Sequence, residues 1–186
     1  EDVSRRFASE GFIALAPDLY HGKTTTSPDS AGRLLMELDA ERAAKEIAAA
    51  GAYLLSRPEC TSKKYGVVGF CMGGALAQLA ATRDEKVGAA VSFYGGFKKV
   101  QIDWSQLAGP ILLIYGELDS SVPPSQAQPL VESIRKLGKE AESIVYPGAN
   151  HAFFNDARPE VHNGSASADA WGRTLAHLRE NLVMGR

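Results

Sequence analysis

A cysteine occupies the position of a nucleophile in a strand-turn-helix pattern. The apolar run 65–70 precedes Cys71, a helix-forming segment follows at 72–83, and Gly69 and Gly73 lie two residues to either side of the cysteine. This spacing is that of a nucleophile elbow, G-x-S-x-G, with cysteine in the serine position. We expect the two glycines to remove side chains that would collide in a tight, strained turn. Because a helix N-terminus favours a thiolate, Cys71 is a candidate nucleophile.

An acidic residue and a histidine follow two later apolar runs. Asp119 comes just after the run 110–115, and His151 comes just after the run 142–146. Since ligands bind at the carboxyl ends of parallel strands, we expect both residues to lie near Cys71. The order nucleophile, acid, histidine is that of the α/β-hydrolase triad. In such a triad His151 takes the thiol proton and Asp119 holds the imidazole in the correct tautomer.

Each candidate also has an ordinary structural interpretation. A cysteine in an apolar stretch is most often a buried core residue, and Asp119 is of a type common in turns. His151 is as well explained by a local hydrogen bond as by catalysis. The joint pattern favours catalysis, because no serine in the sequence has glycine at both −2 and +2 to offer a competing elbow. The backbone N–H of Met72 would then donate to the oxyanion.

Strand and helix patterns alternate along the chain and would position these residues. Strands are predicted at 12–16, 65–70, 87–94, 110–115 and 142–146, and helices at 2–10, 31–56, 72–83, 125–138 and 165–183. A polar loop is predicted at 20–30, and Pro129 is tolerable only in the first turn of its helix. Val- and Ile-rich runs without polar alternation are typical of strands buried on both faces. The order therefore predicts an α/β fold, a mostly parallel sheet with helices on both faces.

The composition is that of one globular domain, which we expect to span residues 1–186. The chain is 45% hydrophobic and long enough to bury a core without disulfides or metals. The net charge of −2 gives no reason to expect nucleic acid or a membrane as partner. Two cysteines without a pairing pattern, and no apolar leader, predict a cytoplasmic protein. We expect a small-molecule partner, no cofactor, no metal, and a monomer or weak homo-oligomer.

These residues together resemble the dienelactone hydrolase family. The matching motifs are Ala16-Pro17-Asp18-Leu19-Tyr20, Gly69-Phe70-Cys71-Met72-Gly73-Gly74, Phe93-Tyr94-Gly95, Gly116-Glu117-Leu118-Asp119 with Val122-Pro123, His151-Ala152-Phe153, Arg158-Pro159 and Ala170-Trp171. The resemblance implies an α/β-hydrolase fold and a Cys71, Asp119, His151 triad. It also implies hydrolysis of dienelactones of the carboxymethylenebutenolide type to maleylacetate. Candidate substrate contacts are Lys23, Tyr94, Phe153 and Arg158.

Two positions depart from the family pattern. At the two positions where family members carry arginines that bind the substrate carboxylate, this sequence has Gly22 and Asn155. Lys23 and Arg158 lie close by in the sequence, and we expect them to substitute. For Arg158 a plain surface ion pair is an equally good explanation.

The start of the chain is also shorter than the resemblance implies. In the family fold, a strand ahead of helix 2–10 lies between strands 12–16 and 65–70, and the loop after it supplies a second oxyanion donor. A sheet without that interior strand would leave backbone groups unpaired. We therefore expect the sequence to be an N-terminally truncated piece that lacks the first strands.

Cysteine as nucleophile narrows the expected substrate. A thiolate leaves a tetrahedral intermediate more readily than an alkoxide does, so the intermediate formed from an ordinary alkyl ester tends to revert to the ester. The intermediate formed from an enol lactone can instead release a stabilised enolate. The predicted function is hydrolysis of activated esters or enol lactones through a thioester on the cysteine. The alternatives are a broader carboxylesterase or thioesterase, and a redox-sensing thiol on a hydrolase scaffold that no longer catalyses.

Overall fold

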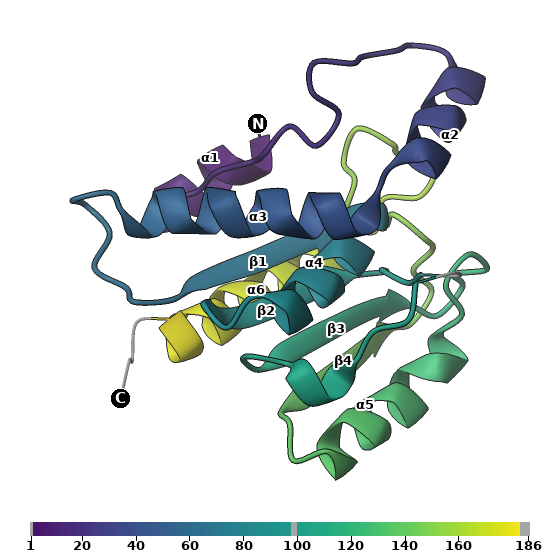
Figure 1. Cartoon of the computed structure of the whole chain (residues 1–186). Coiled ribbons are helices and arrows are strands. Elements are labelled where there is room, and N and C mark those ends of the chain that lie inside the picture. The colour runs from purple at the N-terminus through teal and green to yellow at the C-terminus, as the bar shows by residue number, and fades with distance from the viewer. Residues whose placement is uncertain (1, 98–99, 183–186) are drawn as a thin grey trace.

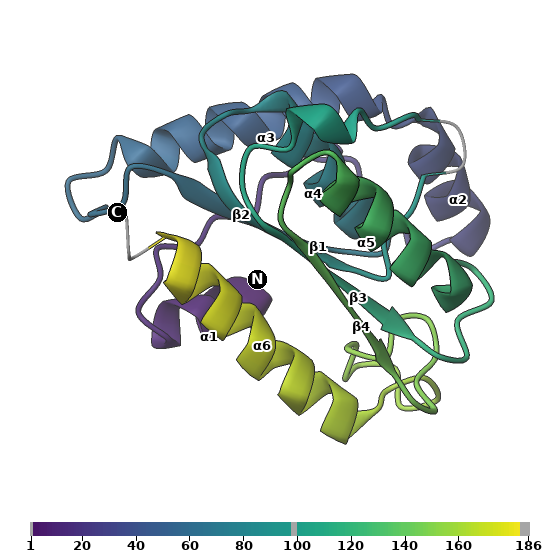
Figure 2. The same cartoon turned by 90° about the horizontal axis from the view of Figure 1, so that it is seen from below.

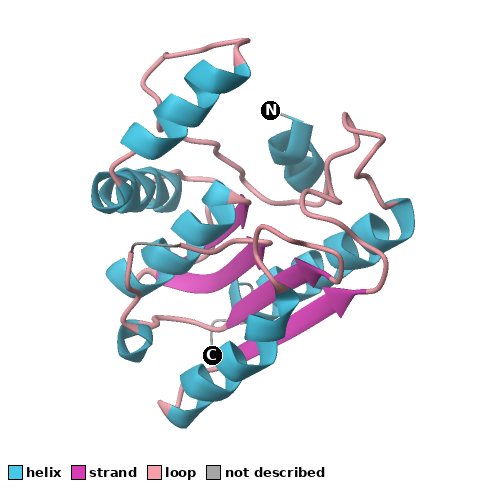
Figure 3. Ribbon diagram, turned by 90° about the vertical axis from the view of Figure 1, so that its right-hand side faces the viewer, coloured by secondary structure: helices cyan, strands magenta, loops and turns pink. Residues whose placement is uncertain are grey.

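Four parallel strands form the sheet. The computed structural model describes residues 2–97 and 100–182, and within them the strand order is β1-β2-β3-β4. The strands are β1 (Tyr65–Phe70), β2 (Val87–Phe93), β3 (Ile111–Gly116) and β4 (Ala141–Tyr146). Val68, Val91 and Leu112 lie in register across the first three strands. Figure 3 shows all arrowheads pointing the same way, so the carboxyl ends of the strands share one edge.

Helices cover both faces of this sheet. They are α1 (Asp2–Ser9), α2 (Pro28–Glu37), α3 (Ala40–Leu55), α4 (Met72–Arg83), α5 (Ala127–Lys136) and α6 (Gly164–Leu182), with short 3-10 helices η1 (Trp104–Gln106) and η2 (Pro124–Gln126). The helices α3, α4 and α5 lie on one face, and α1 and α6 lie on the other (Figure 1, Figure 2). The predicted α/β architecture is therefore confirmed. Among the described residues, no helix combines the length and apolar character needed to cross a membrane.

The core has two halves, one on each face of the sheet. The strands β2 and β3 lie between these halves and are buried along their whole length. Val91 and Ile114 pack in the half that contains residues of α1 and α6. Ala90 and Leu113, their neighbours in sequence, pack in the half that contains residues of α4 and α5. Successive side chains of a strand point to opposite faces, so strands between two helical layers need apolar residues at nearly every position.

Most predicted elements form near their predicted bounds. The strand 65–70 and the helix 72–83, which flank Cys71, have the bounds that the sequence predicted. The other confirmed strands and helices shift by one or two residues at their ends, and residue 183 lies outside the described residues. Pro129 is the third residue of α5, in the first turn, where its missing N–H breaks no helical hydrogen bond.

The prediction of a strand at 12–16 is wrong. These residues are not in a strand, and the sheet within the described chain ends at β1. Residues 12–16 and β1 instead line the same groove. A strand needs a neighbour for its ladder of hydrogen bonds, and no described segment supplies one here.

The single helix predicted at 31–56 is two helices. The first, α2, already begins inside the predicted loop, where the Ser27 side chain accepts from the Ser30 N–H. Leu38 then leaves the helical region with ψ of 120°, and Asp39 caps α3 by accepting from the Arg42 N–H at 3.0 Å. An aspartate in this position satisfies a free N–H of a new helix, so it marks a start rather than a continuation.

Candidate active site

Cys71 lies at the sharp turn between β1 and α4. Its φ is 55° and its ψ is −117°, a conformation that residues with a side chain rarely adopt. The turn is held on both sides, because the Cys71 N–H donates to the Phe93 carbonyl at 3.0 Å and the Cys71 carbonyl accepts from the Ala75 N–H at 3.1 Å. This is the geometry of a nucleophile elbow, and it leaves Cys71 exposed to solvent.

Glycines allow this turn, although Gly73 acts differently from the prediction. A Cβ on Gly69 would overlap the carbonyl of Gly73, and a Cβ on Gly74 would lie 2.6 Å from the carbonyl oxygen of Phe93. A Cβ on Gly73 would meet nothing within 4 Å, so the prediction that Gly73 removes a colliding side chain is wrong. The backbone of Gly73 is instead the obstacle that requires glycine at Gly69.

We expect Gly69→Ala to destabilise the protein and Gly73→Ala to stabilise it slightly. The first variant forces backbone against backbone, and overpacking of this kind costs about 1–3 kcal/mol. The second places alanine in a helix, where it is favoured over glycine by up to about 1 kcal/mol. Urea unfolding followed by circular dichroism measures both. Equal unfolding free energies for the two variants would contradict this account of the elbow.

Asp119 lies in the loop after β3 with its carboxylate held by the backbone. The residue is 3% exposed, and its Oδ1 accepts from the N–H groups of Ser121 at 2.8 Å and Val122 at 2.9 Å. These bonds leave Oδ2 free to face His151. The sequence analysis missed the two donors, although an aspartate followed by serines is typical of a turn in which the side chain accepts from the backbone.

The loop after β4, which carries His151, is tied to the loop of Asp119. The Leu118 N–H donates to the Ala149 carbonyl at 2.9 Å. The carboxylate of Glu117 accepts from the Gly148 N–H at 2.8 Å. Two bonds of this kind restrict the distance between the acid and the histidine. The sequence analysis matched Glu117 only as part of a motif and did not predict this bond.

Cys71, His151 and Asp119 form a chain of hydrogen bonds. His151 Nδ1 lies 2.7 Å from Asp119 Oδ2, and His151 Nε2 lies 3.1 Å from Cys71 Sγ. The hydrogen bond with His151 lowers the pKa of the Cys71 thiol below its ordinary value. The same bond, aided by the hydrogen bond with Asp119, raises the pKa of His151 to about 9. Both shifts favour a thiolate beside an imidazolium.

Met72 begins α4 directly after Cys71, and the interaction of its backbone N–H with the thiol adds to the lowering of the Cys71 pKa. The role of this N–H as an oxyanion donor stays a prediction. The hydroxyl of Tyr20 lies 3.5 Å from the Met72 Sδ atom. Through this contact the loop that follows residues 12–16 reaches the site.

Aromatic rings pack behind His151. The ring centroid of Tyr94 lies 4.9 Å from that of His151. Phe153 is fully buried, with its ring 5.6 Å from Tyr94 and 5.4 Å from Tyr146. Of the two predicted aromatic substrate contacts, Tyr94 contacts His151 and is 2% exposed, and Phe153 is one ring further away and fully buried. Their roles as substrate contacts stay predictions.

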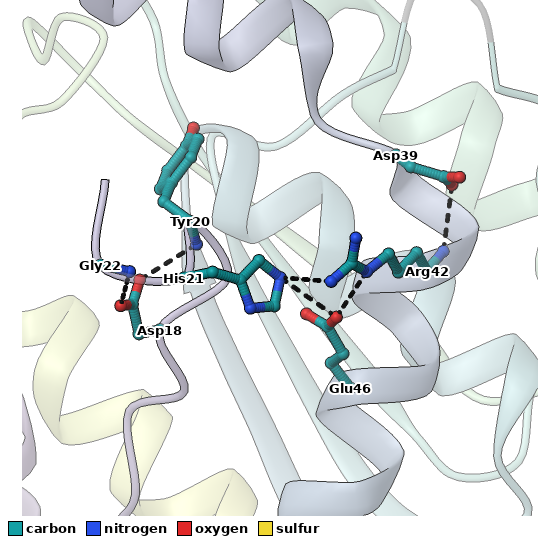
Figure 4. Close-up of polar contacts among 7 residues, drawn as sticks. All are labelled: Asp18, Tyr20, His21, Gly22, Asp39, Arg42 and Glu46. Carbon is teal, nitrogen blue, oxygen red and sulfur yellow. Dashed lines mark hydrogen bonds and ion pairs between the residues drawn. The ribbon is translucent and has the colours of Figure 1, made fainter. Parts of the chain in front are cut away.

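Lys23 lines a separate small cavity. The cavity has a volume of about 140 Å³, and its wall includes Tyr20, His21 and Arg42. In this cavity the Nε2 atom of His21 lies 2.9 Å from the Arg42 guanidinium and 3.2 Å from the Glu46 carboxylate (Figure 4). Figure 4 also shows that the side chain of Tyr20 points in a different direction from His21. Lys23 therefore lines this cavity together with His21 and Arg42, and its role as a substrate contact stays a prediction.

Arg158 pairs with a neighbour at the surface. Its Nε atom lies 2.8 Å from the Glu160 carboxylate, and both side chains are more than half exposed. A pair of this kind contributes at most about 1 kcal/mol to stability. The structure thus shows the ion pair that the sequence left open as one explanation of Arg158.

The remaining histidines with described contacts have partners of their own. The His177 Nε2 atom lies 3.2 Å from the Pro110 carbonyl oxygen, and burial lowers the pKa of His177. His21 lies against Arg42 and Glu46. Within residues 2–97 and 100–182, no group of three or more His, Cys, Asp or Glu side chains is arranged to hold a metal ion.

The fold and the elbow place the chain among the α/β-hydrolases. The model of the dienelactone hydrolase family matches residues 1–182, so the chain belongs to this family of hydrolases. The protein usf of Aquifex pyrophilus is 36% identical over 187 residues, which cover 98% of this chain and 81% of that protein. A protein of Aquifex aeolicus, provisionally named carboxymethylenebutenolidase, is 33% identical over 175 residues, which cover 92% of this chain and 76% of that protein.

Solved structures show the same fold. The crystal structure of a provisionally named dienelactone hydrolase from Klebsiella pneumoniae is similar with a TM-score of 0.85 and 27% identity. That likeness covers 96% of this chain and 80% of the Klebsiella chain. A dienelactone hydrolase-like promiscuous phosphotriesterase from metagenomic libraries has a TM-score of 0.86 at 22% identity, over 97% of this chain and 80% of that one, a likeness of fold alone.

Proposed function

We propose that this protein hydrolyses activated esters, above all enol lactones of the dienelactone type, through a thioester on Cys71. The observation that carries the proposal is the hydrogen-bonded chain from Cys71 through His151 to Asp119. The provisional name carboxymethylenebutenolidase, which several relatives bear, supports the same substrate class. The lowered pKa of Cys71 supports a thiolate as the attacking group.

The first half of the proposed reaction acylates the cysteine. The Cys71 thiolate adds to the lactone carbonyl, and the carbonyl electron pair moves onto oxygen, where the Met72 N–H donates to it. When the carbonyl re-forms, the ring C–O bond breaks and the enolate leaves. The His151 imidazolium then protonates that leaving group. Asp119 stabilises the imidazolium and holds its tautomer.

The second half releases the acid. Neutral His151 takes a proton from water, and the resulting hydroxide adds to the thioester carbonyl. Collapse of this intermediate expels the Cys71 thiolate, which restores the starting ion pair. Because a thiolate is a better leaving group than hydroxide, this step runs forward, and the same property makes alkyl esters poor substrates in the first half.

We expect kcat/KM for an enol lactone to have a bell-shaped pH profile. On the acid side activity rises with the fraction of Cys71 thiolate, whose pKa is lowered by His151. On the alkaline side activity falls as His151 loses its proton near pH 9, since its pKa is raised to about 9. Initial rates corrected for spontaneous hydrolysis measure the profile. Activity that kept rising beyond the pKa of His151 would argue against an imidazolium acid.

The experiment that tests the proposal is acyl trapping. The protein is mixed with p-nitrophenyl acetate and quenched, and peptide mass spectrometry locates the acetyl group. We expect the adduct on Cys71, its loss in Cys71→Ala and its retention in the control Cys60→Ala. No adduct in the unaltered protein would overturn the proposal.

Rates with three substrates then define the specificity. Under the proposal, turnover of an enol lactone exceeds that of p-nitrophenyl acetate and of an acyl thioester. A reversed order would indicate a broader carboxylesterase or thioesterase.

A further inference from the structure

Tyr94, the residue that follows β2, has a backbone conformation that a tyrosine rarely adopts. Its φ is 40°, in the left-handed region. Its N–H donates to the Ile114 carbonyl of β3 at 2.6 Å, and the carbonyl just before it, that of Phe93, accepts from the Cys71 N–H at 3.0 Å. Strain of this kind persists only where the surroundings enforce it, and it is frequent at active sites.

The side chain of Gln78, on α4, holds the chain on both sides of Tyr94. Its Nε2 atom donates to Ser92 Oγ at 2.9 Å and to the Gly95 carbonyl at 3.0 Å. Gln78 is 3% exposed and Ser92 is 1% exposed, so both bonds are shielded from water. A Cβ on Gly95 would overlap the backbone of α4, so the two segments are in direct contact. Buried polar networks whose members are paired hold a segment in one conformation.

The ring of Tyr94 packs against the imidazole of His151. Their ring centroids lie 4.9 Å apart, and the two planes meet at 57°. Three phenylalanine rings pack on Tyr94 as well, with centroid distances of 6.4 Å to Phe70, 6.1 Å to Phe93 and 5.6 Å to Phe153. Because Tyr94 is 2% exposed and protein interiors are close-packed, its ring has no free volume into which to move. His151 therefore has a fixed aromatic neighbour.

The hydrogen bond with Asp119 holds one atom of the imidazole, Nδ1, and a turn of the ring plane would carry Nε2 away from the Cys71 sulfur. A proton passes between two atoms only within hydrogen-bond reach, and Nε2 and Sγ are 3.1 Å apart. We propose that Tyr94, held by Gln78, is a positioning residue that keeps the His151 ring in the plane in which Nε2 faces Cys71. The inference rests on the proposed function, since these are the two atoms that exchange a proton in it.

Alkylation of Cys71 by iodoacetamide tests this inference without ester hydrolysis. The sequence has two cysteines, so every variant also carries Cys60→Ala and a single thiol reacts. The thiolate is the reacting form, so the rate constant at about pH 6 reports how well His151 promotes ionisation of Cys71. We expect Tyr94→Leu to lower this rate constant about tenfold, and Tyr94→Phe, which keeps the ring, to lower it less than about twofold.

Tyr65→Leu is the matched control for the loss of a buried tyrosine ring. Tyr65 is 6% exposed and begins β1, at the opposite end of that strand from Cys71. Its replacement should lower the melting temperature and leave the alkylation rate constant unchanged. An unchanged rate constant in Tyr94→Leu, or an equal fall in Tyr65→Leu, would overturn the inference. A fall in Tyr94→Phe as large as that in Tyr94→Leu would assign the effect to the hydroxyl and overturn the role of the ring.

A double-mutant cycle tests whether Gln78 acts through Tyr94. Gln78→Met removes both hydrogen bonds with little change in volume, and we expect it to lower the alkylation rate constant about threefold or more. In the Tyr94→Leu background the same substitution should have no further effect, and additive effects would overturn the role of Gln78. Thr82→Val is the control on the same helix, because its buried hydroxyl donates to the Leu79 carbonyl. Since Gln78→Met keeps Tyr94, an unchanged rate constant in that variant would overturn the inference even if Tyr94→Leu did not fold.

Rates of enol lactone hydrolysis separate this inference from the proposed function. In Tyr94→Leu and Gln78→Met we expect kcat to fall more than KM changes, because the position of the imidazole affects proton transfer rather than binding. An unaltered protein whose Cys71 is alkylated rapidly at about pH 6 but that hydrolyses no ester would overturn the proposed function and leave the positioning of His151 standing. A Tyr94→Leu variant that kept the full kcat would overturn the inference and leave the proposed function standing.

Discussion

Replacement of Cys71 by alanine is expected to lower kcat/KM for an enol lactone by about 10⁴-fold or more. The variant keeps His151 and the Met72 N–H but loses the group that forms the covalent bond. Water would then have to attack the lactone directly, without the thioester that divides the reaction into two easier steps. Steady-state rates, with circular dichroism to verify folding, measure the effect. A loss of less than tenfold would show that the reaction does not pass through Cys71.

The other cysteine supplies the matched control. Cys60 is partly buried, and its sulfur lies 3.6 Å from the Ser62 carbonyl oxygen, so it has no part in the proposed chemistry. We expect Cys60→Ala to keep the activity of the unaltered protein. Cys71→Ser adds a test of the leaving-group argument, because its preference for enol lactones over alkyl esters should shrink.

The second large effect is expected for Asp119→Asn. The new amide oxygen can still accept from the N–H groups of Ser121 and Val122, which directs the NH₂ group at His151 Nδ1. An NH₂ group there needs an acceptor, so it favours the tautomer whose Nε2 carries the proton and cannot receive one from Cys71. We expect kcat to fall by about 10³–10⁴-fold with little change in fold.

A shift in the pH profile separates this electrostatic effect from simple misfolding. Without the carboxylate, His151 loses one of the contacts that raise its pKa to about 9. The alkaline limb of the pH profile should therefore move to lower pH. Asp103→Asn is the control, since that exposed carboxylate caps a short helix by accepting from Ser105. An alkaline limb that stayed in place in Asp119→Asn would contradict the role of Asp119.

The surroundings of Cys71 could be read from the sequence because their signals are local. A buried strand must be apolar on both faces, and a turn that brings Gly69 against a backbone carbonyl admits no side chain. Both requirements restrict the residue types within a few positions of the cysteine. The parallel order of strands likewise predicted that Asp119 and His151 would meet Cys71 at one edge of the sheet.

Other features were wrong or missed, two because they depend on distant contacts and one because a local signal was overlooked. Residues 12–16 carry the composition of a strand, but pairing needs a neighbour, and the described chain has none beside them. Phe153 looks like a residue of the histidine loop, yet it is buried between Tyr94 and Tyr146. The split of the helix 31–56 followed from a cap at Asp39, a local signal that the apolar spacing concealed.

The sequence by itself determined the α/β order of elements, the elbow at Cys71 and the types of its two partners, Asp119 and His151. Each of these features depends on the spacing of residues that are close together in the sequence. Only the tertiary structure decided the 2.7 Å and 3.1 Å contacts of His151, the raised pKa of that histidine and the groove beside β1. Those properties arise where loops after different strands meet, or fail to meet, and distance in space is not encoded in the spacing of residues along the chain.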